Sequence, residues 1–60
     1  MIFENVKEIG RKKGLTIMEI EKRAGFSNGT IGKWQKSSPR VENVIKVSEV
    51  LGVSVSRLMK

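Results

Sequence analysis

The sequence has 60 residues, which is enough for one small domain but not for separate structural layers around a deep substrate cavity. It contains no cysteine and no histidine, so a disulfide framework, a zinc ribbon and a thiolate nucleophile are excluded, and the absence of the commonest general base argues against an enzyme. The net charge of +6, with a pI near 10.2, points to a polyanionic partner, although an ordinary basic surface would look the same by charge alone.

The first segment has helical periodicity. Phe3, Val6 and Ile9 recur every three residues, so they lie on one face of a helix while charged residues occupy the other. Gly14 follows, and a glycine suits the left-handed residue that ends many helices. The pattern predicts a first helix over residues 2–13.

A capping box marks the start of the second helix. In the run from Thr16 to Glu19, the threonine hydroxyl can accept the Glu19 amide, and the glutamate carboxylate can accept the Thr16 amide. Gly25 interrupts the helical pattern. We therefore expect a second helix from Ile17 to Ala24.

The third helix follows after a three-residue turn. Ser27 is a suitable N-cap, and we expect the helix to run from Asn28 to about Lys36. Ile31 and Trp34 recur at helical spacing and should face inward. This spacing predicts that Trp34 is an anchor of the core rather than an exposed stacking platform.

Two more helices complete the chain. Pro39 suits the first turn of a fourth helix. Its apolar or small residues at helical spacing are Val41, Val44, Ile45, Val47, Ser48 and Leu51. Gly52 ends this helix, and Ser54 can cap a short fifth one, whose apolar residues are Val55, Leu58 and Met59. The sequence therefore predicts an all-α fold: a compact bundle of five short helices in one domain, residues 1–60.

The stretch from Ile17 to Lys36 combines two of these helices with a tight turn. Two helices that cross steeply through such a turn need small or apolar residues at fixed positions. The residues that meet this need are Ile20, Ala24, Gly25, Phe26, Ile31 and Trp34. The stretch therefore predicts a helix-turn-helix.

This pattern resembles the phage-repressor or Cro-type helix-turn-helix family, also called the xenobiotic-response-element family. The similarity covers nearly the whole chain, because it continues at Leu15-Thr16, Lys33-Trp34-Gln35-Lys36, Pro39 and Leu51-Gly52-Val53-Ser54. The resemblance implies a lambda-repressor-like fold that binds double-stranded DNA with its third helix in the major groove. It also implies a transcriptional regulator, in particular a repressor, that binds a palindromic operator as a homodimer.

In that family the N-terminal residues of the third helix contact base edges. The corresponding residues here are Asn28, Gly29, Gly32 and Lys33. Asn28 could pair with adenine and Lys33 could donate to guanine O6 and N7, although both could also belong to an ordinary solvated helix face. The two glycines could let the helix approach the bases closely, or could simply be tolerated in a weakly stable domain.

Contacts to DNA phosphates are expected around the same surface. The candidates are Ser27, Thr30, Lys36, Ser38, Arg40 and Asn43. Arg11, Lys12 and Lys13 form a further basic cluster, for which a solvated helix end is at least as good an explanation as DNA contact.

Two positions depart from the family pattern. Many members begin the second helix with a glutamine that contacts the DNA backbone, and this chain has Ile17 there. Members usually have a small residue where this chain has Glu21. We expect the Glu21 side chain to swing outward or to pair with Lys22 or Lys33.

The fifth helix has more apolar surface than so short a helix can bury, so we expect it to form the dimer interface unless its residues simply close the core. A protein-interaction module, such as an antitoxin or an anti-repressor partner, is the main alternative function, favoured by Glu21 and by the missing glutamine. The dependence of affinity on salt distinguishes the two functions, because DNA binding weakens steeply as the salt concentration rises and binding through an apolar protein interface does not.

No apolar run approaches the roughly 20 residues of a membrane span. The N-terminus also lacks the charged and apolar regions of a signal peptide. We therefore expect a cytoplasmic protein without a membrane partner. Nothing in the sequence suggests a small-molecule substrate, a metal ion or a cofactor.

Overall fold

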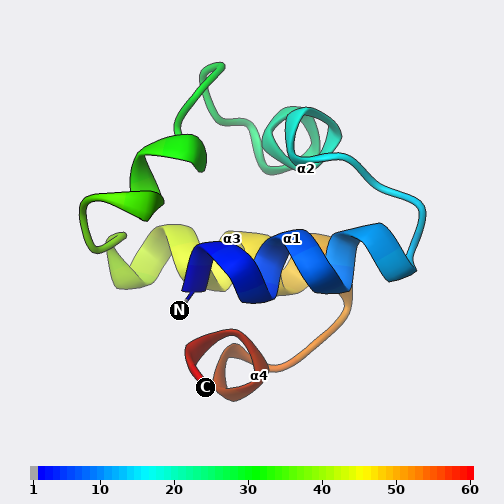
Figure 1. Ribbon diagram of the computed structural model, residues 1–60. Coiled ribbons are helices and arrows are strands. Elements are labelled where there is room, and N and C mark those ends of the chain that lie inside the picture. Colours follow the sequence, from blue (N-terminus) through cyan, green and yellow to red (C-terminus); the bar gives the residue numbers. More distant parts are fainter. Residues whose placement is uncertain (1) are drawn as a thin grey trace.

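The computed structural model describes residues 2–60, which form four α-helices, one short 3-10 helix and no strand (Figure 1). The helices are α1 (Ile2–Lys12), α2 (Ile17–Ala24), η1 (Gly32–Gln35), α3 (Val41–Leu51) and α4 (Val55–Met59). The predicted all-α fold is therefore confirmed. None of the helices within these residues is long and apolar enough to span a membrane.

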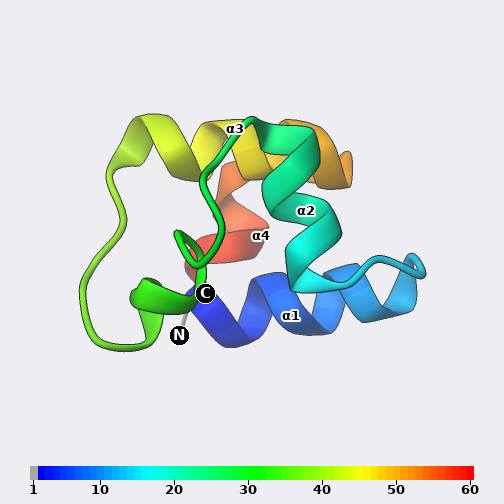
Figure 2. The same cartoon turned by 90° about the horizontal axis from the view of Figure 1, so that it is seen from above.

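The two longest helices, α1 and α3, run in the same direction across the molecule (Figures 1 and 2). The helix α2 and the segment that contains η1 cover one side of this pair, and α4 covers the other. The Cα radius of gyration is 9.9 Å, close to the roughly 10 Å expected for a compact chain of this length. The arrangement leaves α2 and η1 together at one surface.

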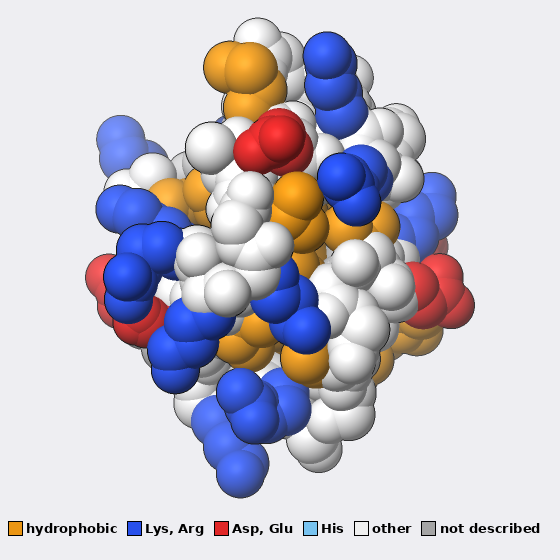
Figure 3. All heavy atoms as spheres, turned by 90° about the vertical axis from the view of Figure 1, so that its right-hand side faces the viewer, with side chains coloured by type: hydrophobic (Ala, Val, Ile, Leu, Met, Phe, Trp, Pro, Cys, Tyr) orange, Lys and Arg blue, Asp and Glu red, His pale blue; other side chains and the backbone are white. Residues whose placement is uncertain are grey.

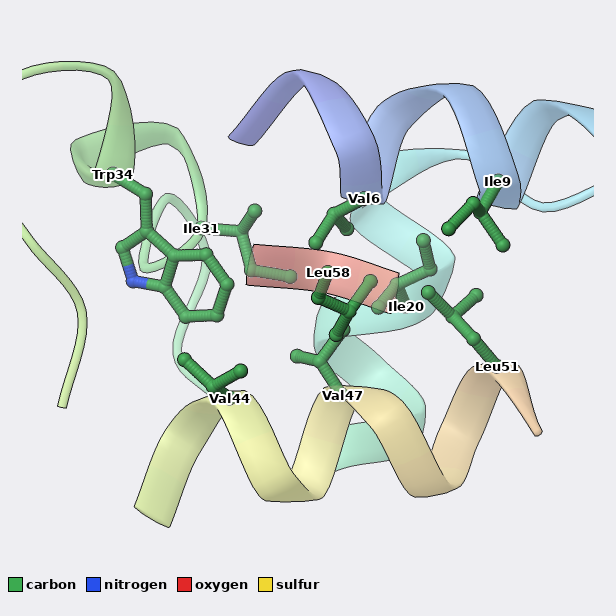
Figure 4. Packing of buried hydrophobic residues seen from close by; sticks show 9 residues of the cluster. All are labelled: Val6, Ile9, Ile20, Ile31, Trp34, Val44, Val47, Leu51 and Leu58. Carbon is green, nitrogen blue, oxygen red and sulfur yellow. The ribbon is translucent and has the colours of Figure 1, made fainter. Parts of the chain in front are cut away.

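All five helices contribute to one hydrophobic core (Figure 4). Its buried members are Val6, Ile9, Ile20, Ile31, Trp34, Val44, Val47, Leu51 and Leu58. The predicted inward orientation of Ile31 and Trp34 is confirmed, because they are 0% and 7% exposed. Burial of a large aliphatic side chain is worth about 1.5–3 kcal/mol, so these residues hold the helices against one another.

The predicted capping box at the start of α2 is confirmed. The Thr16 hydroxyl accepts a hydrogen bond from the Glu19 amide at 3.1 Å, and the Glu19 carboxylate accepts one from the Thr16 amide at 2.9 Å. At the other end of the helix, Gly25 has φ +78°, the left-handed conformation that its lack of a side chain allows. Ser54 caps α4 as predicted, accepting from the Arg57 amide.

The third helix differs from the prediction. Residues 28–31 form hydrogen-bonded turns rather than an α-helix, and only η1 is helical. The interruption lies at Gly29, whose φ of +88° is outside the right-handed helical region and is accessible to glycine at no steric cost. The expected N-cap at Ser27 is therefore also wrong: Ile31 precedes η1, and no side chain caps it.

The last helix is held by contacts across the whole chain. The Asn5 side-chain amide donates to the Leu58 carbonyl at 2.9 Å and to the Lys60 carbonyl at 2.6 Å. Leu58 is fully buried, whereas Met59 is 55% exposed. Of the two alternatives for Leu58, a dimer interface or closure of the core, the structure supports the second, because its side chain fills the core between α1 and α3 (Figure 4).

Replacing Asn5 tests the attachment of α4. Asn5→Ala removes both hydrogen bonds and should lower the free energy of unfolding by about 1–2 kcal/mol, measured by urea denaturation. Lys7→Ala, at an exposed position of the same helix, should change it by less than about 0.5 kcal/mol. An unchanged denaturation midpoint in Asn5→Ala would show that these bonds do not hold α4.

The capping box predicts a dependence of stability on pH. Hydrogen bonds from the Thr16 backbone and side chain hold the pKa of Glu19 below its ordinary value of 4.5. Because the pKa is depressed in the folded state, the stabilisation is present above the ordinary value and is lost as pH falls through the folded one. Glu19→Gln should therefore be less stable than the native protein near pH 7, and the difference should shrink below about pH 4.5 in denaturation curves.

Glu49→Gln is the matched control, because Glu49 is exposed and its side chain makes no hydrogen bond within residues 2–60. Its difference from the native protein should not follow the same pH profile. A Glu19→Gln difference that stays constant from pH 7 to pH 3 would exclude the charged capping box as a source of stability.

Candidate nucleic-acid interface

The helix α2 and the segment after it form one exposed side of the molecule (Figures 1 and 2). We call residues 27–35, the turns together with η1, the recognition segment. Phe26 leads into it and packs edge-on against Trp34, with ring centroids 6.3 Å apart and an interplanar angle of 65°. Trp34 is buried, so the prediction that it anchors the core is confirmed.

A buried carboxylate joins α2 to the recognition segment. Glu21 is 4% exposed. One of its oxygens accepts a hydrogen bond from the Gly29 amide at 3.2 Å, and the other accepts one from the Ile31 amide at 2.8 Å. Hydrogen bonds to an ionised acceptor are about twice as strong as neutral ones, so this pair fixes the turn against α2.

The expectation that Glu21 swings outward or pairs with Lys22 or Lys33 is therefore wrong. Within residues 2–60 the one ion pair joins Arg11 and Glu8. The physical reason lies in the turn: the Thr30 amide donates to the Ser27 carbonyl, whereas the Gly29 and Ile31 amides on either side of it donate to no backbone carbonyl and need another acceptor. The carboxylate satisfies them internally.

A shallow hollow lies between the start of α2 and the recognition segment. Its volume is about 410 Å³, and its lining residues are Ile17, Met18, Glu21, Asn28, Gly29 and Gly32. The structure thus brings together three of the four predicted base-contacting residues. The fourth, Lys33, is exposed on η1 but does not line the hollow.

The sequence prediction missed Met18, whose side chain is 59% exposed. The signal was present, because Ile17, Ile20 and Ala24 already define the inward face of α2 at helical spacing. Met18 falls outside that face, so the same spacing predicts that its large apolar side chain is exposed at the surface.

The predicted phosphate-contacting residues lie in two groups. Ser27 and Thr30 belong to the turns before η1, where Ser27 is exposed and Thr30 half-buried. The other four follow η1: Lys36, Ser38, Arg40 and Asn43. Lys36 and Ser38 line a second hollow of about 270 Å³. The two groups therefore lie on either side of η1 along the chain.

Basic side chains predominate on the side of the molecule at which α1 ends, with hydrophobic side chains exposed between them (Figure 3). Arg11, Lys12 and Lys13 are all exposed. Arg11 is partly neutralised by Glu8, whose carboxylate it contacts at 2.7 Å. That hydrogen bond and the arginine charge hold the pKa of Glu8 below its ordinary value.

Replacing Glu21 tests its role in the turn. Glu21→Leu leaves two amides without an acceptor, at about 1–3 kcal/mol each, so the free energy of unfolding should fall by at least about 2 kcal/mol. Amide exchange at Gly29 and Ile31 should accelerate in NMR measurements. Glu21→Gln keeps one acceptor oxygen and should show an intermediate effect.

Glu42→Leu is the control, because it removes an exposed carboxylate from the first turn of α3. It should leave exchange at Gly29 and Ile31 unchanged. We call the pair of hydrogen bonds from the Gly29 and Ile31 amides to the Glu21 carboxylate the Glu21 clamp. Native-like exchange at both amides in Glu21→Gln would contradict the Glu21 clamp, even if Glu21→Leu did not fold.

Comparison with known proteins agrees with this geometry. A protein family described as "Helix-turn-helix" matches residues 6–58, a range that includes α2, the recognition segment and α3. Neither the curated proteins nor the solved structures gave a significant match. The matched range covers most of the sequence, and the chain belongs to the helix-turn-helix family of Cro- and C1-type DNA-binding proteins.

Proposed function

We propose that this chain is a sequence-specific transcriptional repressor that binds a palindromic operator in double-stranded DNA as a homodimer. Residues 1–60 act as a single DNA-binding domain, without catalytic activity and in the cytoplasm. The observation that carries the proposal is the Glu21 clamp, because it presents a short, rigid segment at the surface of a chain with a net charge of +6.

Base contacts are assigned to Asn28, Gly29, Gly32 and Lys33. The Asn28 amide suits the N6 and N7 atoms of adenine, and the Lys33 ammonium group suits O6 and N7 of guanine. Both side chains are exposed, and Lys33 has no ion-pair partner within residues 2–60. The glycines let the backbone come close to the base edges.

Phosphate contacts position the protein on the duplex without selecting a sequence. We assign them to Ser27, Thr30, Lys36, Ser38, Arg40 and Asn43. Because these residues precede and follow η1 along the chain, they can bind phosphates on both sides of the bases that η1 approaches. Lys36 and Arg40 supply the positive charge, and the others supply polar hydrogen-bonding groups.

A homodimer is proposed because a single small domain rarely gives enough affinity for an operator. Leu58 belongs to the core, so a dimer interface on α4 has to use Met59, which is 55% exposed, and the half-buried Val55. Two-fold symmetry of the dimer would be matched by a palindromic operator with half-sites one helical turn apart.

The second candidate function is a protein-interaction module that keeps the fold. Glu21 no longer supports it, because this residue has a structural role in the turn. Its remaining support is the apolar surface at the start of α2, where Ile17 is half-buried and Met18 exposed.

Selection of bound oligonucleotides from a random pool tests the proposed function. The native protein should enrich a palindromic sequence, and its affinity should fall steeply as salt rises. Lys33→Ala should lose discrimination at one base pair per half-site, worth about 1–3 kcal/mol. Lys7→Ala removes the same charge from α1 and should keep the base preference.

Two outcomes would count against this proposal. Unchanged base preference in Lys33→Ala would remove this residue from the base contacts. No enrichment at low salt would contradict sequence-specific DNA binding and favour the protein-interaction module.

A further inference from the structure

The hollow at the start of α2 has an exposed apolar lining residue, Met18, that none of the proposed base and phosphate contacts uses. We propose that it receives the 5-methyl group of a thymine in the major groove, and that Met18 is the specificity-determining residue that contacts this methyl group. The inference rests on the proposed function, because it names the base that the same surface recognises.

The lining of the hollow disfavours a phosphate. None of its six residues is a lysine or an arginine. Glu21 lies beneath it as a buried carboxylate, with both oxygens already accepting hydrogen bonds from the turn. A phosphate at this place would meet negative charge without a cation. An uncharged apolar group meets no such penalty.

The group that would occupy the hollow can be inferred from the groups that base pairs expose in the major groove. In the major groove, the C5-methyl group of thymine is the apolar group that base pairs present. Met18 is the exposed large apolar side chain of the hollow, with Ile17 half-buried beside it. A methionine side chain is flexible and polarisable, so it can pack closely on a methyl group.

Gly32 leaves the space that a methyl group needs. Its φ is not in the left-handed region, and a Cβ added to it would meet nothing within 4 Å. Neither the backbone nor the packing of the free protein therefore requires glycine here. Gly29 is different, because its φ of +88° is by itself a sufficient reason for a glycine at this position.

Asn28 connects the hollow to the proposed base contacts. It lines this hollow and also an adjacent one of about 240 Å³, which Lys22 and Phe26 border. The amide that suits adenine therefore lies beside the place assigned to the thymine methyl. An adenine and a thymine close together in each half-site would satisfy both contacts.

The test replaces each thymine of the selected operator, one at a time, with deoxyuridine, which lacks only the methyl group. The native protein should bind about fourfold more weakly at one thymine per half-site, the value expected for one buried methyl group. The same replacement should cost Met18→Ala nothing. Fluorescence anisotropy titrations at one fixed salt concentration measure these affinities.

Two further variants complete the experiment. Ile45→Ala truncates another exposed apolar side chain, on α3, where Ile45 is 42% exposed, and it should keep the full penalty for deoxyuridine. Gly32→Ala adds a Cβ in open space, so it should fold normally but bind the thymine operator more weakly. Deoxyuridine at the sensitive position should restore part of that affinity.

The outcomes separate the inference from the proposed function. Equal deoxyuridine penalties in the native protein and in Met18→Ala would overturn the inference and leave sequence-specific binding intact. A native protein that shows no penalty at any thymine, as expected if Met18 contacts a protein partner, would overturn it too. Loss of all sequence-specific binding by the native protein would remove the proposed function and the inference together.

Discussion

The surface assigned to DNA depends on one interaction: the Glu21 carboxylate between the amides of Gly29 and Ile31. Glu21 belongs to α2, which the core residue Ile20 and the capping box at Thr16 hold in place. Ile31 is itself fully buried. The carboxylate thus fixes the turn, which has little secondary structure of its own, to a helix that is held by the core.

This arrangement explains how a short glycine-containing segment can have a defined conformation. A glycine in a helix costs about 1 kcal/mol relative to alanine, and η1 has only four residues. Helix propensity therefore contributes little to its stability. Tertiary contacts replace it: the Glu21 hydrogen bonds hold one end, and the buried Trp34, packed against Phe26, holds the other.

The parts that sequence analysis predicted correctly depend on local signals. The capping box at Thr16, the serine cap of α4 and the inward position of Trp34 each follow from residues a few positions apart. The start of the third helix and the place of Glu21 depend on a contact between residues eight and ten positions apart. Glutamate is rarely buried in proteins, so the residue type alone predicts an outward side chain at this position. The base and phosphate contacts remain predictions, because they depend on the geometry of a DNA complex.

The bonds from Asn5 to the backbone of Leu58 and Lys60 join residues 53 and 55 positions apart in the sequence. Contacts at such separation close a long loop, so they form after the local ones during folding. The core around α2 and α3 can therefore assemble while α4 is still undocked. Because α4 has only five residues and little local stability, its position depends on these bonds and on the burial of Leu58. Undocking of α4 would remove Leu58 from the core that all the helices share and would expose the side chains around it to water.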